Sequence, residues 1–171
     1  MISPLQLFLL VATTFAGLMS GFFYAYSCSV MPGLSRLDDY PFISAMQSIN
    51  RAIQNPVFFT GFFGVLILLP LVTYLKYSSP ASPVFWYLLC ATVIYVTGVF
   101  LVTVVGNIPR NNALAKIDLP GATKELLSTR RKIFETKWNT LNIIRTVCAT
   151  LAFIFALIAC LKCYEHSTII K

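Results

Sequence analysis

Residues 93–114 read VIYVTGVFLVTVVGNIPRNNAL, and this stretch decides between a soluble and a membrane fold. Its first part, 93–105, contains no charged residue, whereas 106–114 brings three amides, a proline and an arginine together. The whole apolar run, about 84–105, is long enough to cross a bilayer, which requires roughly 20 mostly apolar residues. We therefore predict a membrane span that ends at Gly106 and Pro109, where the chain meets water.

The composition of the whole chain agrees with a membrane protein. Of its 171 residues, 57% are hydrophobic and 11% are charged, and the mean hydropathy is +0.77. Soluble domains carry about 25% charged residues, and so few polar side chains cannot cover a soluble protein of this size. Three further segments are long and apolar enough to span, at about 5–30, 57–74 and 141–161. The first is not interpreted as a signal peptide, because it has no basic start and its apolar run is too long.

The segments between the spans complete the predicted architecture. Residues 31–41 contain Pro and Gly and are predicted to form a turn-rich loop. Residues 42–56, FISAMQSINRAIQNP, place apolar side chains at helical spacing opposite a polar face, which predicts a short amphipathic helix. Residues 122–147 contain neither Gly nor Pro, so the fourth span is predicted to be the membrane end of a long helix. The predicted fold class is all-α: a four-helix membrane bundle in one domain, 1–171.

The net charge of +7 is interpreted as a sign of membrane topology rather than of nucleic-acid binding. Lys and Arg favour the cytoplasmic side of short loops. The loops after spans 1 and 3 hold most of these residues, while the other side holds Lys76, Lys162 and Lys171. We therefore predict that these two loops are cytoplasmic and that both termini are outside. The bilayer is the expected environment, and a homo-oligomer stays open.

Arg145 is the most informative single residue, because it lies about one turn inside the apolar part of span 4. A charge at this depth is costly and usually faces a partner or a wet cavity, although its side chain can also snorkel to the interface. Trp138, Asn142 and Arg145 stand at i, i+4 and i+7, on one face of a helix. Singly, Trp138 fits an interfacial belt and Asn142 an interhelical hydrogen bond. Together they favour a site.

Other polar groups reach the same end of the predicted bundle, from three further segments. We predict that Asn107 and Asn111 join Trp138, Asn142 and Arg145 as the catalytic group. The predicted substrate-binding residues are Gln47, Asn50, Tyr24 and Tyr26. A pocket that is apolar below and amide-rich above is typical of small-molecule sites. The expected ligand is a small apolar or planar aromatic molecule.

The chain offers few conventional catalysts. Its single histidine, His166, lies in the tail on the opposite side, and no carboxylate lies within a span. Asp38 and Asp39 are candidates for a base or, less simply, for metal ligands, while Cys160 and Cys163 form a CxxC at the end of span 4. No metal and no cofactor is predicted. Amides, one arginine and aromatic rings remain, and such groups can stabilise an enolate-like anion.

In this order, these motifs resemble the anthrone oxygenase-like integral membrane family. The resemblance rests on residues 17–26, on AMQSIN at 45–50 with Asn55-Pro56, on Asn107-x-Pro109-x-Asn111, and on the Trp138, Asn142, Arg145 stripe. It implies a compact four-helix membrane protein. Some fungal members are associated with the oxidation of anthrones to anthraquinones without a familiar cofactor, so the resemblance implies a monooxygenase that works through an enolate or carbanion.

Two other functional hypotheses stay open beside the monooxygenase. The first is a non-enzymatic membrane protein that binds a lipid, quinone or isoprenoid, or that serves as a small accessory subunit. The second is transport, which four spans without an inverted repeat do not favour.

Overall fold

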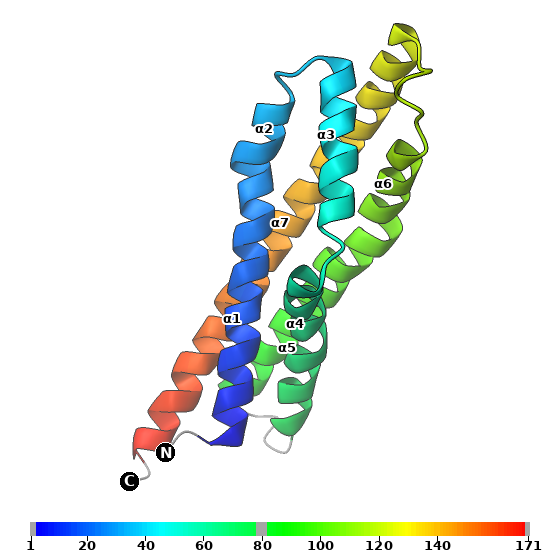
Figure 1. Ribbon diagram of the computed structural model, residues 1–171. Coiled ribbons are helices and arrows are strands. Elements are labelled where there is room, and N and C mark those ends of the chain that lie inside the picture. Colours follow the sequence, from blue (N-terminus) through cyan, green and yellow to red (C-terminus); the bar gives the residue numbers. More distant parts are fainter. Residues whose placement is uncertain (1–2, 78–81, 170–171) are drawn as a thin grey trace.

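The computed structural model describes residues 3–77 and 82–169, with side chains described as far as Tyr164, and all of this part is helix and connecting turns (Figure 1). The elements in chain order are α1 (Pro4–Ala25), the π-helix η1 (Tyr26–Val30), α2 (Met31–Leu34), α3 (Asp39–Ala52), α4 (Pro56–Leu75), α5 (Pro83–Tyr95), the π-helix η2 (Val96–Asn107), α6 (Ile108–Ala115) and α7 (Lys124–Ile169). The all-α prediction is confirmed.

Four continuous helical segments in the described part of the chain are long and apolar enough to cross a membrane, which indicates a membrane protein. They cover Pro4–Leu34, Pro56–Leu75, Pro83–Ala115 and Lys124–Tyr164. The predicted spans all fall within them. α1 begins and α7 ends at the same end of the bundle, as an even number of crossings requires (Figure 1). Which side of the membrane this end faces stays a prediction.

The helix α7 organises the bundle, because α1 and α5–η2 both pack along it. Small residues of α7 make the close packing possible, since Ala149, Ala152 and Ala156 are all fully buried in the central core cluster. α4 packs on α1 and α5, and the Tyr95 hydroxyl donates to the Phe62 carbonyl oxygen at 3.0 Å. α4 starts lower than its neighbours, and α3 lies above its first turn (Figure 1).

Two segments predicted as turns are helical. Span 1 continues through Pro32 to Leu34, and span 3 does not end at Gly106 and Pro109 but continues to Ala115. Each proline follows a π-helical turn: Met31 N–H donates to the Tyr26 carbonyl, and Ile108 N–H to the Thr103 carbonyl. A π-turn is wider than an α-turn, so it accommodates a ring that clashes inside an ordinary helix.

Arg110, one of the basic residues that follow the predicted third span, makes a structural contact at this junction. Its guanidinium Nη1 donates to the Gly106 carbonyl oxygen at 2.7 Å. This hydrogen bond spans the junction between η2 and α6. Arg110 therefore stabilises the continuous helix from η2 into α6.

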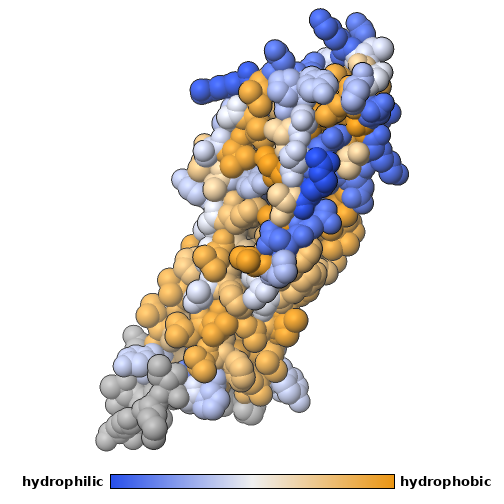
Figure 2. Space-filling view, viewed as in Figure 1, coloured by the Kyte–Doolittle hydropathy of each residue, from blue (hydrophilic) through white to orange (hydrophobic). Residues whose placement is uncertain are grey.

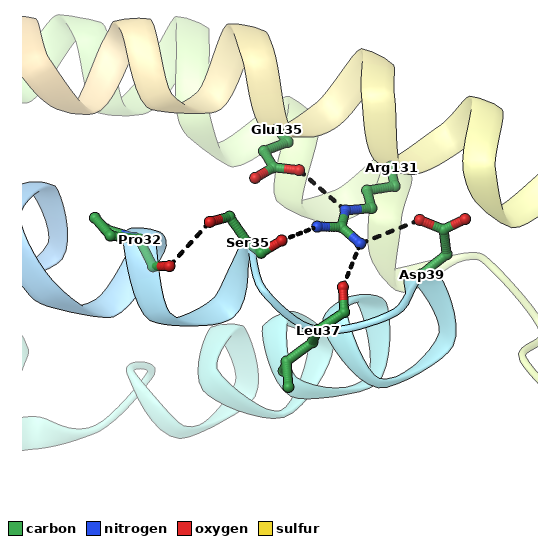
Figure 3. A network of polar contacts seen from close by, with 6 residues as sticks. All are labelled: Pro32, Ser35, Leu37, Asp39, Arg131 and Glu135. Atoms are coloured by element: carbon green, nitrogen blue, oxygen red, sulfur yellow. Dashed lines mark hydrogen bonds and ion pairs between the residues drawn. The ribbon is translucent and has the colours of Figure 1, made fainter.

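The predicted amphipathic helix is confirmed as α3, which is held against α7 by Arg131. The Arg131 guanidinium donates to the carbonyl oxygens of Leu37 at 2.6 Å and Ser35 at 2.8 Å, and it pairs with Asp39 at 3.1 Å and Glu135 at 3.0 Å (Figure 3). It also lies 4.4 Å from the centre of the ring of the buried Phe42. This network fixes the turn that leads from α2 into α3.

The surface divides along the long axis of the molecule. Apolar residues dominate the lower part, and hydrophilic residues gather toward the upper end, near α3, α6 and the start of α7 (Figure 2). The long helix predicted to start near Ala122 begins at Lys124 and supplies much of this upper end. The structure thus has one polar end, as the loop sequences predict.

Candidate functional site

A cavity of about 300 Å³ lies beneath α3, where α1, α4, η2, α6 and α7 meet. Its volume falls at the lower end of the range for small-molecule sites, roughly 300–1,000 Å³. Eight of the nine residues predicted for the site line it: Tyr26, Gln47, Asn50, Asn107, Asn111, Trp138, Asn142 and Arg145. Tyr24 does not, since its side chain is 60% exposed on the outer face of α1. Tyr24 precedes Tyr26 by two positions, which turns it to the opposite side of the helix.

Arg145 is a buried cation without a carboxylate partner among the described residues. It is 6% exposed, and its Nη2 donates to Asn142 Oδ1 at 2.8 Å and its Nη1 to Thr103 Oγ1 at 3.4 Å. The guanidinium lies 4.6 Å from the ring centre of Phe23 and 5.3 Å from that of Trp138. No acidic residue is found among the cavity-lining residues in the described part of the chain. The snorkelling alternative does not fit, because a snorkelling head group stays in water.

The Arg145 guanidinium also keeps a free donor. Its Nε is buried and has no hydrogen-bond partner. Buried charges in proteins are generally paired and fully hydrogen-bonded, because desolvation of an unpaired ion is costly. The aromatic faces and two neutral oxygens offset only part of this cost. The arrangement therefore favours an anion in the cavity.

Asn107 offers a second set of unused hydrogen-bonding groups. Its side chain is 1% exposed, and neither its Oδ1 nor its Nδ2 has a partner. Asn50 Nδ2 is likewise buried and unpaired. Such groups are rare in native proteins, where about 90% or more of buried polar groups are hydrogen-bonded. Asn107 supplies one donor and one acceptor, and Asn50 one donor, to whatever the cavity binds.

The other predicted amides are engaged in holding the site together. Asn111 Oδ1 accepts from Trp138 Nε1 at 2.9 Å, which fixes the indole against α6. Asn142 Nδ2 donates to Ser27 Oγ at 2.8 Å and to the Phe23 carbonyl at 3.3 Å. These two asparagines position the aromatic ring and the guanidinium: Asn142 uses both of its amide atoms in this way, and Asn111 uses its Oδ1.

Gln47 has a comparable structural contact. Its Nε2 donates to the carbonyl oxygens of Leu114 at 2.9 Å and Ile117 at 3.1 Å. These carbonyls lie at the end of α6 and just beyond it, and the Leu114 carbonyl also accepts from the Ile117 N–H at 3.2 Å. Gln47 therefore ties α3, as the roof of the cavity, to α6.

Aromatic rings form most of the lower wall, and several of them were not predicted. Phe22, Phe23 and Tyr26 come from the end of span 1, and Trp138 from α7. α4 and η2 add a further set that the sequence reasoning missed: Phe58, Phe59, Phe62, Phe63 and Phe100. The signal was present in FFTGFF at 58–63, whose phenylalanines recur at i and i+4 and so share a helix face. Such flat apolar walls suit a planar aromatic ligand.

The remaining candidates lie away from the cavity. Asp39 is bound to Arg131 in the α2–α3 turn, and neither it nor Asp38 lines the cavity. Cys160 and Cys163 lie near the opposite end of the bundle, in the cluster around Val72 and Leu88. The side chain of His166 lies outside the described residues.

Comparison with known proteins gives one match. A sequence model of a family described as anthrone oxygenase matches residues 56–155, more than half of the chain. The matched segment contains Asn107, Asn111, Trp138, Asn142 and Arg145, whereas α1 and α3 lie outside it. No curated protein sequence and no solved structure matches the chain.

Proposed function

The chain belongs to the anthrone oxygenase family, and on that premise we propose that its cavity binds a planar, oxygenated aromatic molecule and promotes its oxidation by dioxygen. The proposed substrate class is an aryl ketone with an acidic CH₂ group, as in an anthrone. The single observation that carries the proposal is the buried Arg145 guanidinium, which has no carboxylate partner in the described part of the chain and keeps one free donor.

Arg145 has the geometry to stabilise an enolate oxygen. Loss of a proton from the CH₂ group places negative charge on the ketone oxygen, and a buried cation favours that form over the neutral ketone. Because the guanidinium is held in advance by Asn142 and by the rings of Phe23 and Trp138, little reorganisation accompanies the appearance of the charge. Asn107 Nδ2 supplies a second donor in the same cavity.

The oxidation balances with dioxygen alone. The carbanion passes one electron to dioxygen, and the resulting radical and superoxide combine to a peroxide at the former CH₂ carbon. After protonation, loss of water leaves a carbonyl at that carbon. One oxygen atom enters the product and the other leaves as water. In this scheme the cavity-lining residues bind, orient and stabilise the anion. The proton passes to water beside three exposed polar residues that also line the cavity: Arg51, Gln54 and Asn112.

Oxygen uptake tests this proposal. Purified protein in lipid nanodiscs is mixed with emodin anthrone, and Arg145→Gln is compared with wild type. We expect the rate above the spontaneous reaction to fall by about 10²–10³-fold, the usual loss when one preorganised donor to an oxyanion is removed. Arg130→Gln is the matched control, because Arg130 lies on α7 near the same end of the bundle, is exposed and does not line the cavity; this variant should keep the wild-type rate.

The two parts of the proposal fail separately. Equal rates in wild type and Arg145→Gln would contradict the role of Arg145. Absence of catalysed uptake by wild type, in a sample that is folded, would contradict the substrate class.

The non-enzymatic alternative has one observation in its favour. Among the described residues that line the cavity there is no carboxylate or histidine to serve as a base. A protein that only binds a quinone or a similar lipid needs none. Native mass spectrometry separates the two functions: a stoichiometric ligand that is unchanged under oxygen supports binding alone.

A further inference from the structure

The wall of the cavity formed by α4 and η2–α6 contains exposed apolar side chains. Four large apolar residues line the cavity and are also exposed on the outer surface: Phe59 at 40%, Phe63 at 42%, Val104 at 40% and Ile108 at 43%. A residue in a closed cavity wall can also be exposed on its outer side. Here, however, the exposed residues come from both neighbouring segments: two from α4, and two from η2 and α6. These residues define the opening.

The surrounding contacts outline this opening. α4 runs downward from Pro56, whereas η2 runs upward to Asn107 (Figure 1). At the lower edge the rings of Phe63 and Phe100 meet, with centroids 6.5 Å apart. The opening thus lies between α4 and the third span, directly above this ring pair.

The upper rim of the opening is polar. It consists of Arg51 of α3, Gln54 of the turn between α3 and α4, and Asn112 of α6, all exposed and all lining the cavity. On this face of the molecule, hydrophilic residues lie above the apolar surface of α4 (Figure 2). The apolar flanks of the opening therefore suit contact with lipid chains, and its polar rim suits the membrane interface.

We propose that the ligand reaches the cavity sideways from the bilayer, through the opening between Phe59 and Val104, as an uncharged lipophilic molecule with its oxygen groups at the interface. The inference rests on the proposed function in taking the cavity as the ligand site. The flanks are apolar, and an anion crossing them would lose its hydration without gaining a partner. The ligand therefore crosses uncharged and meets Arg145 only inside.

The chain contains a natural reporter for this route. It has two tryptophans; Trp138 lines the cavity and is 4% exposed, while Trp86 lies in α5 and is 55% exposed. Trp86→Phe leaves Trp138 as the single indole. In nanodiscs, quenching of its fluorescence by a doxyl-labelled alkane reports access from the lipid, and quenching by acrylamide reports access from water.

We expect the alkane to quench Trp138 strongly and acrylamide to quench it weakly. Val104→Phe narrows the opening and should remove most of the alkane quenching. Val105→Phe is the matched control, because Val105 is 71% exposed and does not line the cavity; it should leave the quenching unchanged. Thermal unfolding of both variants verifies that they are folded.

Two results would overturn the inference: quenching by acrylamide but not by the alkane, or equal alkane quenching in the two valine variants. The measurement needs no substrate and no turnover. A failure of the oxygen-uptake assay therefore leaves the quenching result unaffected. A failure of the quenching experiment, in turn, does not contradict the enolate chemistry, which the oxygen-uptake assay tests.

Discussion

Individual residues of the cavity divide into those that hold the site and those that are free to bind. Asn142 is hydrogen-bonded through both amide atoms and Asn111 through its Oδ1, whereas Asn107 has two unsatisfied amide atoms at 1% exposure. A buried polar group without a partner costs roughly 1–3 kcal/mol of stability. Asn107 is therefore expected to be retained for a ligand rather than for the fold.

This difference in hydrogen bonding predicts opposite effects on stability when each of two asparagines is replaced by leucine. Asn107→Leu removes unsatisfied polar atoms and should stabilise the ligand-free protein by about 1 kcal/mol, while abolishing the stabilisation by added ligand. Asn142→Leu removes the hydrogen bonds to Ser27, Phe23 and Arg145, and it should destabilise by roughly 1–3 kcal/mol. Thermal unfolding in one detergent, with and without emodin anthrone under nitrogen, measures both. A loss of stability in Asn107→Leu as large as in Asn142→Leu would show that Asn107 is structural.

The sequence predicts which residues line the cavity, but not which of them keep amide atoms without a hydrogen-bond partner. The spacing of Trp138, Asn142 and Arg145 on one helix follows from helical periodicity alone. Whether Asn142 or Asn107 keeps a free amide depends on atoms contributed by other helices, such as Ser27 Oγ and the Phe23 carbonyl. Those contacts require the relative rotation of the helices, which no pattern within one segment contains.

At the scale of elements, the third span departs from a regular α-helix. η2 is π-helical from Val96 to Asn107, and π-helical turns are frequent at functional sites because they change which side chains face inward. A π-helix holds more residues in each turn than an α-helix does. In this wider helix Asn107 faces the cavity, and the chain continues in a helix past Pro109. From sequence, Gly106 and Pro109 indicated a helix end, since proline usually breaks an α-helix. The π-geometry that avoids the break has no comparable sequence signal.

The packing of η2 on α7 depends on Gly98. A Cβ atom at this position would lie 2.6 Å from Cys148 Cβ, and neither atom can rotate away. Gly98→Ala should therefore separate the two helices and destabilise the protein by roughly 1–3 kcal/mol, the usual cost of overpacking.

Gly21→Ala is the matched control for this prediction. Nothing lies within 4 Å of a Cβ at Gly21, so alanine should be neutral or slightly stabilising in the helix. Unfolding of both variants in a denaturing detergent provides the comparison, and Cys148→Gly in the Gly98→Ala background should recover part of the loss. Equal stability of the two alanine variants would mean that η2 and α7 are not in close contact at Gly98.

At the scale of the whole molecule, the chain is an apolar bundle with a polar upper end, and the cavity lies where the two meet (Figure 2). Composition and loop charges predict this division, because few charged residues are present and most of them follow spans 1 and 3. The aromatic wall from α4 was not predicted, since phenylalanine in a span is equally compatible with contact to lipid. Only the placement of α4 against η2 turns its phenylalanines into a cavity wall.

The central claim is that this cavity stabilises the anion of a planar aromatic ketone through Arg145. The absorption spectrum of emodin anthrone bound to the protein under nitrogen tests it most directly, at a pH where the free compound is neutral. The account predicts the spectrum of the anionic form with wild type and Arg130→Gln, and that of the neutral form with Arg145→Gln. A neutral-form spectrum with wild type, or an anionic one that persists in Arg145→Gln, would contradict the account.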